Sequence, residues 1–346
     1  MTKHIRPLSV LFFSLVLSAP LLGRAAGGDE DVKKQKLINR SYPVTADDKL
    51  QIDNQFGNVV VSTWDKAEIT VDIEISARAA TDEKAQDILN RIDVKETKGD
   101  HLISFKTKVD EIHDSNGNNH NRHGDGDNRS FYIDYVIHMP SANRLEIENS
   151  FGKTEVPDFK GLVTLTSKFG SLNTGKLENV DAIHVEFGKA YITEVDNGKI
   201  TFAYNGESKI GKVNGNVKIT SEFSNHVQVT VADNIQELNV FESYSGIRMV
   251  VGKSLSAQIA VHTSFGSFHN ESEFSINEHK EESDYGPHFD KDYSGTAGDG
   301  KAKIMIKSSF GSVRLSYNNG NDNDDDEKDK DKEKDKGDRK HTRVSV

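Results

Sequence analysis

A short unit that ends in an aromatic residue, mostly followed by glycine or serine, recurs along most of this chain, and its spacing limits the folds that the chain can adopt. In each unit two apolar residues stand at alternate positions, a polar residue follows two places on, and the aromatic comes two places later. There are nine such units, the first beginning at Leu50 and the last at Ile304. Those beginning at Ile183 and Ile200 carry an apolar residue at the polar position. The corner residues are Phe56, Gly57, Phe151, Gly152, Phe169, Gly170, Phe187, Gly188, Phe223, Phe265, Gly266, Phe310 and Gly311.

The spacing of the aromatic residues predicts stacked β-strands. From Phe151 to Phe265 an aromatic recurs every 17–21 residues, which is too short for a βαβ crossover of about 30 residues. We therefore predict an all-β fold, a single-stranded parallel β-helix or solenoid, with one corner in each turn and strands stacked about 4.8 Å apart. An antiparallel sandwich with hairpins at the glycines is the alternative. The solenoid is favoured because equivalent positions carry the same residue type in consecutive turns.

The corner residues have predicted structural roles. We expect each aromatic ring to stack on its equivalents in the turns above and below. The following glycine permits the positive φ that a tight corner often requires, and the polar residue two places before the aromatic is expected to form ladders of hydrogen bonds. A carbohydrate-stacking stripe is the functional alternative for the rings. Core or corner positions are favoured because solvent-facing phenylalanines promote aggregation.

Two segments interrupt the repeat within the predicted solenoid, which covers residues 40–317 and has its regular rungs at 145–317. Residues 58–139 are predicted to form a small α/β N-terminal cap, because a solenoid end exposes strand edges that need covering. Within it, Thr81 to Ile92 has an N-cap residue followed by apolar residues at helical spacing. The polar loop 112–130 is predicted to be disordered.

The second interruption and the C-terminal segment are polar. Residues 270–300 contain Gly286-Pro287 and several further glycines, and they are predicted to form a loop inserted before the last rung. The tail 318–346 consists almost entirely of charged and polar residues. Such a segment cannot bury enough apolar surface to offset the entropy of ordering, so disorder is expected.

The N-terminus has the pattern of a signal peptide. A basic start containing Lys3 and Arg6 precedes an apolar run from Leu8 to Leu22, and small residues follow up to Ala26. Residues 1–26 are therefore predicted to be removed on export, to the periplasm, the cell surface or the medium. An uncleaved anchor is the alternative, but the run is shorter than the roughly 20 residues of a membrane span. No later segment is apolar enough to span, so the mature chain is expected to lack a transmembrane segment.

Composition excludes several classes of function. The chain has no cysteine, which rules out disulfides and thiolate metal sites. Its 55 acidic residues outnumber its 44 Lys and Arg, giving a formal net charge of −11. This acidic balance argues against nucleic acid and anionic membranes as partners.

One loop contains metal-ligating residue types. Its weak candidate ligands are His113, Asp114, His120, His123 and Asp125. Asp114, Asn116 and Asn118 have the spacing of a calcium loop, and the histidines suit zinc or copper. However, Asn119 replaces the glycine of a calcium loop, and no helices are predicted on either side. We therefore interpret the segment as a hairpin tip of turn-forming residues, without a metal or other cofactor.

Catalytic motifs are not recognisable in the sequence. Carboxylates that could group on neighbouring rungs are Glu186, Glu194, Asp196, Glu207 and Glu222, but their positions relative to the corners do not coincide. A polysaccharide-active β-helix enzyme would need such a group on one face. We therefore predict that the protein is not an enzyme.

The chain resembles the putative-adhesin family of secreted bacterial β-solenoids, a domain of unknown function. The similarity lies in Leu50 to Val59, in Ile133 to Pro140 with the following Leu145-Glu146-Ile147, and in Gly298 to Gly311. It covers about residues 40–317 and implies a single solenoid domain at the envelope or cell surface, with no established catalytic residues. The His/Asn loop and the charged tail look like additions peculiar to this chain.

The sequence thus predicts an exported, non-enzymatic protein of the cell envelope or surface that acts in binding, adhesion or scaffolding. Its expected partner is a surface glycan or an envelope protein. The alternatives are a polysaccharide-active enzyme and an accessory protein of the envelope stress response. The ligand, the oligomeric state and the handedness of the solenoid are not encoded in a recognisable pattern.

Overall fold

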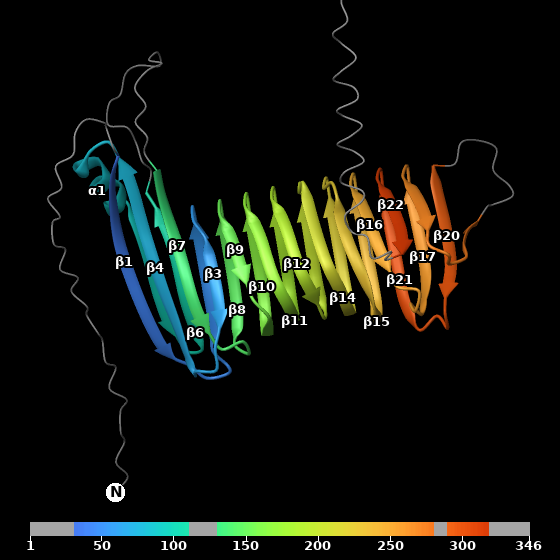
Figure 1. The fold of residues 1–346 in the computed structure, drawn as a ribbon, viewed down its shortest axis with the longest axis horizontal. Helices are drawn as coiled ribbons and strands as arrows, with labels where there is room; N and C mark the ends of the chain where they lie inside the picture. The colour runs from blue at the N-terminus through green and yellow to red at the C-terminus, as the bar shows by residue number, and fades with distance from the viewer. Residues whose placement is uncertain (1–30, 111–129, 280–288, 318–346) are drawn as a thin grey trace, which may run out of the picture.

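The structure, a computed structural model, describes residues 31–110, 130–279 and 289–317. Within them the chain forms 22 strands and one helix, which confirms the prediction of an all-β chain with one helix. Figure 1 shows the strands side by side from β1 at one end to β20 at the other. The predicted signal peptide, the metal-candidate loop from His113 to Asp125 and the charged tail lie outside the described residues.

One row of strands leads into the aromatic corners, and we call it the leading row. Its members pair in parallel in an order that follows the sequence only in the middle of the molecule. In spatial order they are β6 (Leu102–Val109), β2 (Lys49–Gln55), β8 (Arg144–Ser150), β10 (Phe159–Lys168), the end of β11 (Ser171–Glu186), β13 (Gly198–Ala203), the ends of β14 (Glu207–Glu222) and β15 (Val227–Ser243), β21 (Ala302–Ser309) and β17 (Ala257–Ser264).

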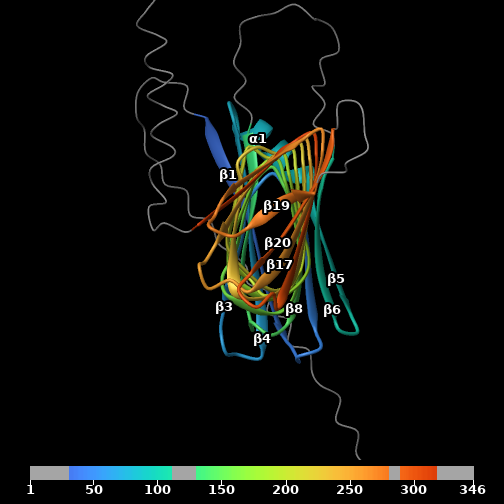
Figure 2. The same ribbon diagram turned by 90° about the vertical axis from the view of Figure 1, so that its right-hand side faces the viewer.

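A second row, the trailing row, leaves the corners and is also parallel. β11, β14 and β15 belong to both rows, because each trails one corner and leads into the next. The other members, in spatial order, are β7 (Ser130–Met139), β3 (Val59–Thr63), β9 (Lys153–Val156), β12 (Lys189–Val195), β16 (Gly246–Val251), β22 (Ser312–Tyr317) and β18 (Ser267–Glu271). Seen from the end that carries β17 and β20, the strands of successive coils overlap (Figure 2).

The N-terminal end is covered by antiparallel strands and the helix. β1 (Val32–Pro43) pairs with β4 (Glu68–Ala79), which pairs with β7, while β5 (Ile92–Gly99) pairs with β6. The helix α1 (Asp82–Asn90) packs on β1 and β4, and Thr81 caps it by accepting a hydrogen bond from the backbone N–H of Lys84 at 3.3 Å. The predicted helix is therefore confirmed. No helix of the described residues has the length and apolar character needed to cross a bilayer.

At the C-terminal end the order of coils differs from the order of the sequence. The last coil, β21 with β22, lies between β15–β16 and β17–β18. Residues 270–300 are not only a loop as predicted, because they contain β19 (Ile276–His279) and β20 (Asp290–Ala297). β20 pairs antiparallel with β17, and β19 pairs with β20. β20 thus pairs with the edge of β17 opposite β21, and β19 adds one more strand beyond β20. The polar sequence of this segment does not reveal either pairing.

The core lies between the two rows. Apolar side chains at alternate positions point inward, so strands such as β2 and β8 alternate between buried and partly exposed residues. The polar residue two places before each aromatic also points inward. Seven such residues are buried, namely Asn54, Asn149, Ser167, Ser221, Glu242, Thr263 and Ser308.

The predicted polar ladder forms hydrogen bonds at the N-terminal end of this row. The side-chain amide of Asn54 donates to Asn149 Oδ1 at 3.1 Å, and Thr107 donates to Asn54 Oδ1 at 3.0 Å. Asn149 donates in turn to the Gly57 carbonyl at 3.1 Å. By contrast, the hydroxyls of Ser167, Ser221 and Thr263 have no hydrogen-bond partner among the described residues. Farther along the row the Ser308 hydroxyl donates to Glu242 on the adjacent coil, so each of these bonds between coils involves a longer amide or carboxyl side chain.

We expect Asn149→Ala to lower the free energy of unfolding by about 2 kcal/mol, because the substitution leaves buried partners of the amide unsatisfied. Ser221→Ala serves as the matched control, since it removes a buried hydroxyl that has no partner. That control should change stability by less than about 0.5 kcal/mol. Urea unfolding followed by circular dichroism measures both values. Equal losses in the two variants would contradict the hydrogen-bonded role of Asn149.

Candidate functional site: an exposed aromatic ladder

The corner aromatics form one continuous stack, which we call the aromatic ladder. Neighbouring ring centroids lie 4.8–5.1 Å apart with interplanar angles of 2–12°. Phe131 packs edge-on against the first ring and Phe289 stacks on the last. The nine rings, in spatial order, are Phe56, Phe151, Phe169, Phe187, Tyr204, Phe223, Tyr244, Phe310 and Phe265. With eight steps, the ladder is about 40 Å long.

The aromatic residue, and not the following glycine, has the left-handed backbone conformation at each corner. All nine have φ between 49° and 63°, a region that costs an ordinary L-residue roughly 1–2 kcal/mol. The expectation that glycine supplies the positive φ is therefore wrong. Asparagine or glycine would adopt this conformation more easily. The chain nevertheless has an aromatic at all nine positions, so stacking must offset the backbone strain.

The glycine has a different role, because it allows adjacent coils to approach closely. A Cβ on Gly152 would lie 1.8 Å from the carbonyl oxygen of Gly57, and one on Gly170 would lie 1.9 Å from that of Gly152. Gly188 is similar, at 2.3 Å from the Gly170 oxygen. No side chain fits at these distances, and the neighbouring atoms belong to the backbone. These glycines allow consecutive corners to lie in direct contact.

The rings are half exposed and not part of the core. The eight corner aromatics that follow Phe56 in the ladder, from Phe151 to Phe265, retain 45–53% of their accessible surface. An aromatic side chain presents 150–250 Å², so these eight leave about 800 Å² of apolar surface in one stripe. The largest apolar patch of a typical monomer is about 300–600 Å² and is often functional. The ladder is therefore a candidate interaction surface.

Stacking leaves only the ring edges accessible along most of the ladder. Each inner ring has a neighbour about 5 Å away on both faces. A sugar ring or a planar ligand that stacks on aromatic residues needs an open face, and no inner ring provides one. The geometry thus suits an apolar partner that lies along the edges. It does not suit a carbohydrate-stacking stripe.

The flanks of the ladder differ along its length. In the central coils Glu186 precedes a corner and Lys189 follows it, on the outward sides of the leading and trailing rows. At the corners of Tyr244, Phe310 and Phe265 the flanking residues are serine and glycine only. The ladder therefore has a mixed-charge rim in the middle and an uncharged rim towards the C-terminal end.

A buried carboxyl group lies just behind the uncharged part of the ladder. Glu242, two residues before Tyr244, is 3% exposed. Its Oε1 accepts a hydrogen bond from the Ser245 backbone N–H at 2.6 Å, and its Oε2 accepts one from the Ser308 hydroxyl. A Cβ on Gly311 would lie 1.7 Å from this carboxyl. Burial raises the pKa of Glu242 above its usual value of 4.5, although the two hydrogen bonds oppose the rise.

This raised pKa predicts a pH-dependent contribution to stability. A carboxyl whose pKa is higher in the folded state stabilises the fold below pH 4.5, and that contribution is lost as the pH rises through the folded value. We therefore expect the stability of the wild type relative to Glu242→Gln to fall as the pH rises above 4.5. Urea unfolding of both proteins across that range tests the sign. A difference that grows with pH would contradict it.

The carboxylates considered for catalysis do not form a catalytic group. Lys176 forms ion pairs with Glu194 and Asp196 at 3.0 and 2.9 Å, and the Tyr191 hydroxyl donates to Glu207 at 2.7 Å. Glu186 lies 3.6 Å from His184, and Glu222 is an exposed strand residue. Glu194 and Asp196 therefore share Lys176, whereas Glu207 and Glu186 contact other side chains.

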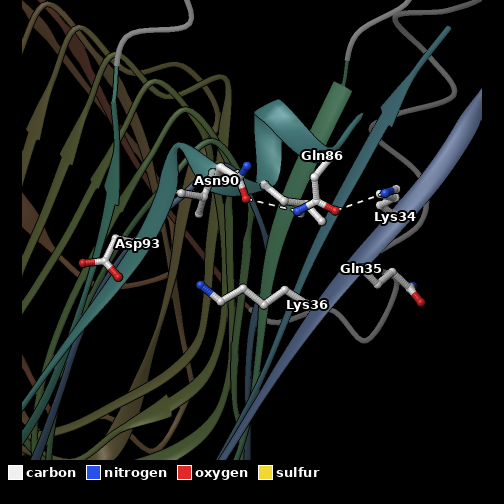
Figure 3. A pocket seen from close by; sticks show the side chains of 8 residues that line it. Lys34, Gln35, Lys36, Gln86, Asn90 and Asp93 are labelled. Carbon is white, nitrogen blue, oxygen red and sulfur yellow. Dashed lines mark hydrogen bonds between the residues drawn. The ribbon is translucent and has the colours of Figure 1, made fainter. Parts of the chain in front are cut away.

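Two surface hollows lie at the ends of the molecule. The first lies between β1, α1 and β5, where Gln86 accepts from Lys34 and donates to Asn90, both at 3.1 Å (Figure 3). Three of its polar side chains, Lys34, Gln86 and Asn90, bond to one another, which reduces their availability to a ligand.

The second hollow lies over β17, β20 and β19. There His262 contacts Asp292 at 2.9 Å and His279 contacts Ser294 at 2.6 Å. The two histidines have different partners, so no single serine–histidine–aspartate relay forms. No group of three or more His, Asp or Glu side chains in the described part of the chain is placed to hold a metal ion.

Comparison with known proteins gives similarity to solved structures only. Neither a family model nor a curated protein matches the chain. A putative adhesin from Bacteroides fragilis is 12% identical, with 81% of this chain and 97% of that chain covered and a TM-score of 0.42. A putative lipid binding protein from Parabacteroides distasonis is also 12% identical, with 81% and 96% covered and a TM-score of 0.36. At these TM-scores the similarity carries no inference about function, which is argued below from the chain's own residues.

Proposed function

We propose that this protein is an exported, non-enzymatic β-solenoid of the cell envelope or surface that acts in binding, adhesion or scaffolding through its aromatic ladder. The observation that carries the proposal is the continuous, half-exposed stack of nine corner rings. An apolar stripe of about 800 Å² is larger than a soluble monomer usually leaves uncovered. Its partner is an apolar surface of an envelope or surface component.

Three further features support this proposal. Export follows from the basic, apolar and small-residue order of residues 1–26. The parallel pairing of equivalent strands in both rows supports a solenoid, and a solenoid presents a long surface on which the same side chain is repeated. The separate pairing of the acidic side chains supports a binding role over polysaccharide hydrolysis or elimination.

Binding of the labelled mature protein to whole cells and to separated envelope components tests the proposal. We expect Phe223→Asn/Tyr244→Asn to reduce the bound amount at least about fivefold, because asparagine fits the left-handed backbone but removes the rings. Tyr191→Asn is the control, since Tyr191 is a 40% exposed aromatic that is not one of the nine stacked rings. Equal binding by the wild type and the double variant would overturn the ladder as the binding surface.

A further inference from the structure

We infer that the partner of the aromatic ladder is the ladder of a second copy of this chain, and that the two copies lie side by side in parallel around a twofold axis. This inference rests on the proposed function, because it identifies the apolar surface that the ladder contacts. It makes the binding homotypic, so that each exported copy binds another copy of itself. The repeat of the ladder, its exposed area and the charges on its rim all favour such a pair.

The ring spacing of one ladder matches the ring spacing of a second copy. The rings are spaced 4.8–5.1 Å apart over eight steps, without a gap where β21 is inserted out of sequence order. A second copy has the same ring spacing by identity. Contact can therefore continue along the whole ladder, whereas an unrelated partner would need a matching repeat of its own.

The exposed apolar area of the ladder is large enough for a stable interface. The eight half-exposed rings leave about 800 Å² of apolar surface on each copy. A stable interface buries about 800 Å² per partner. One ladder placed on another therefore provides the area of an ordinary dimer before the flanking side chains are added. The uncharged serine and glycine flanks near Tyr244 allow close approach there without desolvation of a charge.

The charged residues on the rim of the ladder favour the parallel arrangement of the two copies. In an antiparallel pair with full overlap, Tyr204 lies at the centre and the leading rows face each other. Glu186 of each copy then lies opposite Glu222 of the other, because these residues flank the corners on either side of Tyr204. Like charges placed opposite one another oppose association.

In a parallel pair, the leading row of one copy faces the trailing row of the other at the same coil. Glu186 then lies opposite Lys189 of the second copy, twice by symmetry. Among the described residues of one copy, Glu186 has His184 at 3.6 Å as its ion-pair partner, and Lys189 lies 3.6 Å from Glu207. Both side chains belong to the exposed rim, so they remain accessible to a partner's charge.

Sedimentation velocity of the mature protein at increasing concentration tests the inference. We expect a dimer whose dissociation constant rises at least about tenfold in Glu186→Lys and in Lys189→Glu, because each variant places like charges opposite one another. The double variant Glu186→Lys/Lys189→Glu should return to within about threefold of the wild type, since the charges are exchanged and paired again. Lys212→Glu, at an exposed position beside the opposite bend of β14, is the matched charge control and should have no effect.

Three results would overturn the inference. The first is a wild type that stays monomeric at about 100 µM, well above the micromolar dissociation constants of specific interfaces. The second is a dimer that persists in Phe223→Asn/Tyr244→Asn, and the third is a double charge variant no better than the single ones.

A monomer whose binding to cells still depends on Phe223 and Tyr244 would leave the proposed function standing and refute only the second copy. Flotation of that monomer with phosphatidylcholine vesicles would then identify a lipid surface as the partner instead.

Discussion

Replacing Gly170 with alanine is expected to lower the free energy of unfolding by about 3–5 kcal/mol, because the added methyl group has no space at this corner. The added Cβ would lie 1.9 Å from the carbonyl oxygen of Gly152 and 2.9 Å from its carbonyl carbon. Both atoms belong to a backbone held by coils on either side, so neither can rotate away as a side chain would. The clash can be relieved only by separating adjacent coils.

The matched control for this substitution is Gly206→Ala, at the corner that begins with Tyr204. Gly206 has no atom within 4 Å of an added Cβ, and the close position at that corner is already occupied by Asn205. We expect this variant to lie within about 0.5 kcal/mol of the wild type. Urea unfolding followed by circular dichroism compares the two proteins. A loss below about 1 kcal/mol in Gly170→Ala would show that the coils can separate easily, against the close packing described here.

The repeat predicts the direction and spacing of the strands well, because it is set by the backbone and by alternation of side chains. Ile52, Ile147 and Leu165 occupy equivalent positions in the motif, and the structure pairs them in register. The order of coils at the C-terminal end could not be predicted. The coils that begin at Ile259 and at Ile304 carry the same motif, so on sequence alone either of them could pair with the coil of Leu238. Tertiary packing places Ile304 beside Leu238.

The conformation and exposure of the corners could be predicted only in part. Stacking of Phe151 on Phe169 follows from the identity of residues one coil apart. The assignment of the positive φ to the glycine was wrong because glycine serves two needs, conformational freedom and close approach, and the sequence does not separate them. Phenylalanine at a left-handed position is rare. Its half-exposed ring could therefore be recognised only once the corner geometry was known.

The strength of the ladder can be measured at Phe187, which has a stacked ring on each face. Phe187→Ala removes two stacking contacts, each with ring centroids 4.9 Å apart. Each contact contributes about 0.5–1.5 kcal/mol. The substitution also removes the buried half of the Phe187 ring, and the loss of this buried apolar surface costs about 2–3 kcal/mol at 25 cal/mol per Å². Alanine keeps the strained left-handed backbone, whose φ is 51° in the wild type. We therefore expect a loss of about 3–6 kcal/mol in the free energy of unfolding.

Phe187→Asn separates the contribution of stacking from that of backbone strain. Asparagine loses the same ring contacts but tolerates the left-handed region, so this variant should be about 1 kcal/mol more stable than Phe187→Ala. Urea unfolding of the two variants beside the wild type gives both differences. If asparagine and alanine were equally destabilising, strain at the corner would be negligible. If asparagine matched the wild type, stacking would do no more than offset the backbone strain, and the nine exposed rings would then have to be explained by binding.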